Sequence, residues 1–322
     1  MSNLYLDRKN LSVKLDGQAL VLYEDGARKG SVPLNLLERV VMHGNVLLES
    51  RVLGALSERN ISLLLLSGRY SEATAMLVGR SHNDSMRRIG QYRLVEDSEL
   101  RKELAFQLIC HKLRAQRRFL HDALLQRPDL RYPLSTSNET LMTILNTLAQ
   151  LSELPDSDQL QGYEGAGAAA FFSGYRHLFP DALKFTGRKK RPPPDPVNVC
   201  LSLGYTLLHY DAVRALHQVG LDPMLGFFHE LHFGRESLAC DLIEPLRPLV
   251  DRWVWQLFRD RQLTMDHFSF ENERCLLGKA GRQIFYGCYE AEARAVRRLL
   301  RLNGYRLARR CLEIYQQSVG LL

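Results

Sequence analysis

The tetrapeptide SHND, residues 81–84, separates two parts of the chain that differ in hydrophobic periodicity. Before it, short segments alternate apolar and polar side chains, as strands with one buried face do. After it, apolar side chains recur at helical spacing, and no later segment has the pattern of a strand. The sequence therefore predicts an α+β fold, with a small β domain at residues 1–80 followed by an all-α domain at residues 81–322.

The first part contains five segments with strand character, separated by turn sequences such as Asp16-Gly17. The last of them is a continuous apolar run, which suits a strand buried on both faces. A short helix is predicted at 47–57. The five segments are LYL (4–6), LSVKL (11–15), ALVLYE (19–24), RVVMH (39–43) and ISLLLLS (61–67).

The second part is predicted to be a series of helices, interrupted by GRKKRPPPDP at 187–196. Four consecutive cations followed by prolines cannot form a helix interior, so this segment is a basic loop. Asp195 and Pro196 then suit the N-cap and first residue of the next helix. The predicted helices span 98–126, 138–152, 157–178, 196–218, 238–260 and 283–317.

Composition favours an ordinary globular protein of the cytoplasm. No apolar run approaches the ~18 residues that span a bilayer, and the amino terminus has no secretory signal pattern. The six cysteines contain no C-x-x-C pair, which argues against a zinc knuckle or a disulfide framework. The net charge of +7 favours a polyanionic partner, although many basic proteins bind none.

Glu164 is the first candidate site residue. On the predicted helix its neighbours are mostly small or apolar, so the carboxylate would lie on a face suited to close helix packing. A buried carboxylate must pair with a cation, bind a metal or become protonated. The alternative is a glutamate at a partly exposed helix end.

The segment GFFHELHFGRESLACDLIEP, residues 226–245, supplies further candidates. Asp241 and Glu244 are three residues apart on a helix that Ser237 can cap, and they can clamp a cation together. Acidic residues in the first turns of a helix are also favoured by its dipole without any ligand. Pro245 and Pro248 each remove a helical hydrogen bond, which predicts a break at the acidic pair.

His229 precedes this helix and can turn its imidazole toward the carboxylates, although a histidine among aromatic residues is often simply packed. One imidazole with carboxylates and no thiolate suits Mg²⁺ or Mn²⁺ better than structural zinc. Basic clusters at 114–118, 188–191 and 294–301 fit a surface that follows DNA phosphates, or a solvated surface without a ligand.

Three motifs together closely resemble the CRISPR-associated adaptation integrases, the metal-dependent DNA endonucleases numbered first in the Cas series. They are YEGAGA (163–168), RPPPDPVNVCLSLGYTLL (191–208) and GFFHELHFGRESLACDLIEPLRP (226–248). The resemblance covers nearly the whole chain. It implies an amino-terminal β domain, which we expect to mediate dimerisation, joined to a helical catalytic domain.

The resemblance also implies roles for individual residues. Glu164, His229 and Glu244 correspond to the ligands of Mg²⁺ or Mn²⁺, and Asp241 matches an additional catalytic acid that is either a supporting partner or an alternate ligand. Asn198 and Tyr205 fall where side chains scaffold the site. We expect DNA contacts from Arg188, Arg191, Arg235 and Arg247.

By the same resemblance we expect a homodimer that acts on double-stranded and branched DNA and inserts short foreign DNA into a repeat array. Its expected partner is the small companion adaptation protein, second in the Cas series. The segment HELHFGR departs from the more usual HEPRYGR at Leu231, His232 and Phe233. Two other functions suit the same residues: a metal-dependent phosphohydrolase acting on small nucleotides, and a non-catalytic DNA-binding adaptor.

Overall fold

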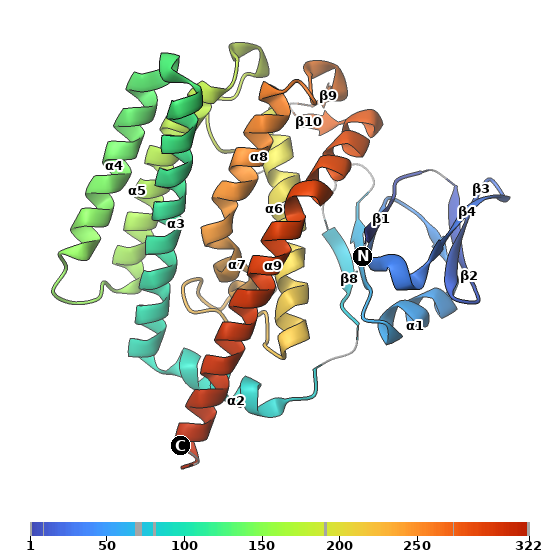
Figure 1. Ribbon diagram of the computed structural model, residues 1–322, viewed down its shortest axis with the longest axis horizontal. Helices are drawn as coiled ribbons and strands as arrows, with labels where there is room; N and C mark the ends of the chain where they lie inside the picture. The colour runs from blue at the N-terminus through green and yellow to red at the C-terminus, as the bar shows by residue number, and fades with distance from the viewer. Residues whose placement is uncertain are drawn as a thin grey trace. The chain divides into compact units, whose positions relative to one another are not determined.

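The computed structural model describes residues 2–8, 10–67, 73–79, 82–189, 192–272 and 274–320. The chain divides into two compact units. The first comprises the residues up to 83 together with 286–291, and the second comprises 84–285 and 292–322. Figure 1 shows strands in the amino-terminal part of the chain and helices in most of the remainder. The predicted α+β class is thus confirmed.

The first unit contains two four-stranded sheets around one short helix, α1 (Ser50–Glu58). In the first sheet β1, β5 and β7 are parallel and β8 is antiparallel to β7. Its order is β1 (Ser2–Leu6), β5 (Leu37–His43), β7 (Ser62–Leu66), β8 (Ala73–Leu77). The second has the order β4 (Ala27–Pro33), β3 (Ala19–Glu24), β2 (Leu11–Asp16), β6 (Leu47–Leu48).

Apolar side chains from both sheets and from α1 share one core, to which Val13, Leu20, Val40, Val52 and Leu63 belong. All five predicted strands are present, and β7 is almost completely buried, as its apolar run predicts. The sequence did not predict β4, β6 or β8, and it assigned Leu47 and Leu48 of β6 to the short helix, which begins only at Ser50. Because β4 carries mostly exposed, polar side chains at a sheet edge, it lacks the alternation that identified the other strands.

The second unit contains eight α-helices among its described residues and several short 3-10 segments, η2 to η6. Figure 1 shows α3, α4 and α5 side by side. The helices are α2 (Ser85–Glu96), α3 (Ser98–Gln126), α4 (Arg131–Ala149), α5 (Ser157–Tyr175), α6 (Pro196–Val219), α7 (Ser237–Ile243), α8 (Arg247–Arg259) and α9 (Lys279–Ser318), whose residues 286–291 belong to the first unit. The 3-10 segments are η2 (Pro128–Leu130), η3 (Arg176–Leu178), η4 (Asp181–Leu183), η5 (Glu244–Leu246) and η6 (Met265–His267).

Two helix starts follow directly from the sequence. Asp97 caps α3 by accepting hydrogen bonds from the amides of Glu99 and Leu100, and the helix has the predicted bounds. Asp195 caps α6 by accepting a 2.8 Å hydrogen bond from the amide of Asn198. Both caps fix helices that supply side chains to the candidate site.

An aromatic cluster joins three of these helices. The Phe119 ring of α3 lies 5.7 Å from Phe171 and 5.7 Å from Tyr175 of α5, and 6.0 Å from Trp255 of α8. These rings are all buried, so they hold α3, α5 and α8 together by burying a large apolar area. The candidate site lies on the same three helices and the segment before α8.

One expectation for the second part is wrong. No strand was predicted after residue 84, but the structure has two there. They are β9 (Phe268–Glu271) and β10 (Arg274–Leu277), which pair as an antiparallel hairpin. Four-residue strands are too short to show the alternation that distinguishes a strand from other structure. Within the described ranges, none of the helices is both long and apolar enough to cross a membrane.

Candidate metal centre

The predicted helix at 238–260 is broken where its prolines lie. Helix α7 ends at Ile243, η5 follows with Pro245 in its first turn, and α8 begins again at Arg247. This confirms the predicted break at the acidic pair. The predicted cap is wrong, because Ser237 is already helical and its hydroxyl donates a 3.0 Å hydrogen bond to the carbonyl of Glu230.

Asp241 is completely buried, and its carboxylate organises the loop before α7. Oδ2 accepts hydrogen bonds from the amides of Phe227 and Phe228 at 2.7 and 3.0 Å, and Oδ1 accepts one from the amide of His229 at 3.0 Å. Oδ1 also lies 2.6 Å from His229 Nδ1. Because backbone amides occupy this carboxylate, the geometry supports the supporting role over that of an alternate ligand.

Gly226 allows the loop to approach Asp241 closely. A Cβ at this position would lie 2.7 Å from Asp241 Oδ2 and 2.7 Å from the backbone of Ser237, which is closer than side chains tolerate. A glycine is therefore needed for the loop to reach the carboxylate. The same loop then carries His229, whose side chain is 23% exposed.

Glu244 is buried in η5, with 6% of its side chain exposed. Its Oε2 lies 2.5 Å from the ammonium of Lys112, and its Oε1 accepts a 2.8 Å hydrogen bond from Arg247 Nε. Burial alone would raise the pKa of this carboxyl, but Arg247, Lys112 and the nearby His229 hold the pKa at about 2. Glu244 is therefore ionised at neutral pH.

Glu164 lies on α5, with a quarter of its side chain exposed. Its Oε1 accepts a hydrogen bond from the ammonium of Lys112, so the residue is both paired and partly exposed. Gly167, one turn further along α5, allows α3 to come close, since a Cβ there would lie 2.2 Å from Leu113 Cδ2. By contrast, a Cβ at Gly162 or Gly165 would meet nothing within 4 Å, so these two do not mediate this contact.

The sequence did not identify Lys112, the cation that joins the two glutamates. It lies on α3 and is only 6% exposed. Its position between Ile109 and Gln116 places it on the buried side of the helix, since residues three and four apart share one face. A lysine on an otherwise buried face needs an anionic partner, and this signal was available in the sequence.

The side chains of the three predicted ligands are not arranged as a complete metal coordination site. In the part of the chain that the structure describes, no group of three His, Cys, Asp or Glu side chains is arranged to hold an ion. Two carboxylates from different elements nevertheless share one cation, Lys112, and His229 is close enough to lower the pKa of Glu244. Oxygen donors with one imidazole are suited to Mg²⁺ or Mn²⁺.

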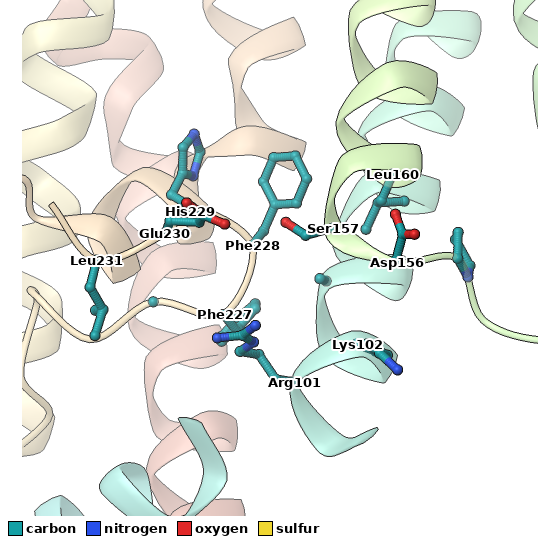
Figure 2. Close-up of a pocket in the computed structure, with 13 residues that line it drawn as sticks. Arg101, Lys102, Asp156, Ser157, Leu160, Phe227, Phe228, His229, Glu230 and Leu231 are labelled. Atoms are coloured by element: carbon teal, nitrogen blue, oxygen red, sulfur yellow. The ribbon is translucent and has the colours of Figure 1, made fainter. Parts of the chain in front are cut away.

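A pocket adjoins His229 (Figure 2). Figure 2 shows the loop that carries Phe227 to Leu231 facing the first turn of α5, where Ser157 and Leu160 lie. Arg101 and Lys102, from the first turns of α3, line the same pocket. Two cationic side chains thus line the pocket that His229 also lines.

Comparison with known proteins identifies the family. The family described as CRISPR associated protein Cas1 matches residues 4–291. The CRISPR-associated endonuclease Cas1 1 of Thermodesulfovibrio yellowstonii is 39% identical over 317 residues, which cover 97% of this chain and 98% of that relative. This chain belongs to the Cas1 family. The resemblance noted in the three sequence motifs is thereby confirmed.

Solved structures share the Cas1 fold. A CAS1 protein from Thermotoga maritima superposes with a TM-score of 0.84 at 24% identity, and the match covers 97% of both chains. A casposase bound to its integration product has a TM-score of 0.84 at 21% identity, covering 97% of this chain and 91% of that one. At these identities the likeness establishes the fold.

Asn198 and Tyr205, the expected scaffold residues of this Cas1 chain, lie in one polar network. Asn198 accepts a 2.9 Å hydrogen bond from Arg188 Nη1 and donates a 2.7 Å bond to Asp195. Tyr205 donates a hydrogen bond to Asp251, and Arg247 lies over its ring, 4.7 Å from the centroid. This network holds Arg247, which in turn holds Glu244.

Asp251 is a second acid that the sequence did not single out. It is buried on α8 beside Tyr205. Burial raises the pKa of its carboxyl to about 7, against the hydrogen bond from Tyr205 and the charges of Arg247 and Arg188, which lower it. Nothing in its local sequence distinguishes it from an exposed aspartate, because its burial depends on how α6 and α8 pack.

The four arginines expected to contact DNA differ in their surroundings. Arg188 and Arg247 are partly buried and bonded within the network described above, whereas Arg235 is exposed. Arg191 lies outside the described residues. DNA contacts by these side chains stay a prediction.

The basic clusters also differ. Arg114, Arg117 and Arg118 are exposed on α3, the helix that carries Lys112. In the cluster at 294–301, Arg297 points inward, since its guanidinium pairs with Asp211 at 3.1 Å and is 12% exposed. The expectation that the cluster at 294–301 forms one surface is therefore wrong for Arg297.

Proposed function

We propose that this Cas1 family protein is a metal-dependent DNA endonuclease and integrase that inserts short foreign DNA into a CRISPR repeat array. The observation that carries the proposal is the sharing of one cation by Glu164 and Glu244, from α5 and η5, beside His229. Family membership supports the reaction class, and the arrangement of these side chains supports the proposed position of the active site.

Glu164, His229 and Glu244 would hold Mg²⁺ or Mn²⁺. A bound ion of this kind polarises a phosphodiester and stabilises the attacking and leaving oxygens of an in-line displacement. Asp241 holds the imidazole of His229 through Nδ1, which leaves Nε2 free to face the site. Arg247 keeps Glu244 ionised and in place. The nucleophile is a DNA 3′-hydroxyl in integration and water in cleavage.

Cationic side chains around the site would position the DNA backbone. Arg101 and Lys102 line the pocket beside His229, and the exposed arginines at 114, 117 and 118 continue along the same helix. Contacts to phosphate fix the register of the duplex and carry no direct sequence information. We also expect DNA contacts from Arg188, Arg191, Arg235 and Arg247.

Assembly and location follow from family membership alone. We propose a homodimer formed through the β domain, which binds the small companion adaptation protein, second in the Cas series. The substrate is double-stranded and branched DNA in the cytoplasm. Dimer formation can be tested by light scattering of the purified protein.

The test of the catalytic assignment is cleavage of branched DNA with Mn²⁺ by the wild type, Glu164→Ala and His229→Ala. Each variant should lose at least about a hundredfold in rate, because each removes one side chain that holds the ion. Glu139→Ala and His121→Ala are matched controls, since both side chains are exposed, and they should retain wild-type rates.

Three outcomes would contradict the proposal. Undiminished cleavage by both site variants would place the reaction elsewhere. Absence of cleavage in every form, with DNA binding intact, would identify an adaptor. Hydrolysis of small nucleotides together with DNA affinity that does not fall with salt would identify a phosphohydrolase, because backbone binding releases counterions.

A further inference from the structure

Lys112 occupies the space between the two glutamates that the proposed function assigns to a metal ion. Its ammonium bonds to Glu164 Oε1 and, at 2.5 Å, to Glu244 Oε2. The side chain is only 7% exposed, and its ammonium is paired with both carboxylates. One monovalent cation therefore already joins the two carboxylates.

The second cation at this site is placed differently. Arg247 bonds to the other oxygen of Glu244, Oε1, and its guanidinium also lies over the ring of Tyr205. An ion bound at Glu244 Oε2 would leave that contact intact. Arg247 can thus remain when an ion binds, whereas the ammonium of Lys112 is bonded to the two oxygens that face each other across the site.

A divalent ion and an ammonium cannot both occupy that space. Two like charges a few ångströms apart in a largely buried site repel strongly, and an ion that joins Glu164 Oε1 to Glu244 Oε2 needs the oxygens that the ammonium already holds. Removal of the ammonium would leave two carboxylates without their shared counterion, and this arrangement attracts a divalent ion more strongly. An ion that joins these two oxygens can therefore bind only by displacing the side chain.

We propose that Lys112 is a positioning residue that holds Glu164 and Glu244 together in the metal-free protein and competes with the divalent ion for them. This inference rests on the proposed function, since it assumes that the ion binds to these two glutamates. It gives Lys112 an effect on metal affinity that a purely structural lysine would not have. Loss of the ammonium should tighten metal binding.

The experiment is a titration of the purified, DNA-free protein with Mn²⁺, followed by electron paramagnetic resonance of the free ion. Lys112→Met should bind Mn²⁺ at least about tenfold more tightly than the wild type, and Lys112→Gln should show the same direction. Lys112→Arg keeps the positive charge and should bind no more tightly than the wild type. Lys29→Met, at an exposed lysine of β4 in the first unit, should leave the affinity unchanged.

A Glu164→Gln variant in the same titration distinguishes the two proposals. If it weakens Mn²⁺ binding but Lys112→Met and Lys112→Gln bind no more tightly than the wild type, the competition is overturned and the metal site stands. If Glu164→Gln binds as the wild type does, the ion lies elsewhere and both proposals fail. The near-ultraviolet circular dichroism of each variant shows that it is folded, and Lys112→Gln serves if Lys112→Met is not.

Discussion

Two carboxylate groups lie three residues apart around the end of α7, and the protein neutralises them in different ways. Asp241 accepts hydrogen bonds from three backbone amides and contacts one imidazole. Glu244 is held by the side chains of Lys112 and Arg247, and Glu164 shares the first of these. Backbone amides cannot leave without a change in the loop, whereas an ammonium can move. Asp241 therefore fixes the shape of the loop, whereas Glu244 and Glu164 can exchange the ammonium of Lys112 for another cation.

The largest expected effect on the free energy of unfolding comes from a substitution at Asp241. Asp241→Ala would leave the amides of Phe227, Phe228 and His229 without their acceptor inside a closely packed loop, which should lower the free energy of unfolding by about 3 to 5 kcal/mol. Urea denaturation checks this value, with Asp158→Ala, an exposed aspartate of α5, as the control. A loss below about 1 kcal/mol would show that the loop does not depend on this carboxylate.

The next largest effect is the contribution of Glu244 to the pH dependence of stability. The folded pKa of about 2 lies below the ordinary value of 4.5, so the ionised group stabilises the fold above pH 4.5, and this contribution is lost as pH falls toward 2. Between pH 5 and pH 3 the wild type should lose about 2 kcal/mol more than Glu244→Gln. Urea denaturation at both pH values measures it, with Glu139→Gln as the control. Equal losses in Glu244→Gln and the wild type would mean that the ion pairs do not hold this carboxylate ionised.

The smallest effect on stability should come from Glu164. Because its side chain is a quarter exposed and Lys112 keeps Glu244 as a partner, Glu164→Gln should change the free energy of unfolding by about 1 kcal/mol or less. Differential scanning calorimetry of this variant beside the wild type tests it. A loss as large as that of Asp241→Ala would remove the distinction between the two kinds of carboxylate.

Much of the fold could be predicted from local sequence patterns. The bounds of α3 follow from its helical spacing, the cap of α6 follows from Asp195, and the break at Glu244 follows from two prolines. The hairpin at 268–277 was missed because its strands are too short to show a period. Long helices and helix ends are therefore the features that local sequence patterns predict best.

The candidate site was only partly predictable. Glu164, His229 and Glu244 were identified by type, spacing and resemblance, and the helical spacing of α3 places Lys112 on a buried face, but the partners of Lys112 and the burial of Asp251 depend on packing between helices that are distant in sequence. The Ser237 cap failed because its hydroxyl bonds to the carbonyl of Glu230. A residue whose partner lies 132 positions away, as Glu244 does from Lys112, gives no local signal of that pairing.

The most direct test of the central claim is a crystal structure of the protein grown with Mn²⁺, with anomalous diffraction used to locate the ion. We predict an anomalous peak bounded by Glu164, His229 and Glu244, with the ammonium of Lys112 moved away and Asp241 still bonded to the loop amides. A structure with Mn²⁺ bound at another position and Lys112 still joining the two glutamates would contradict the account.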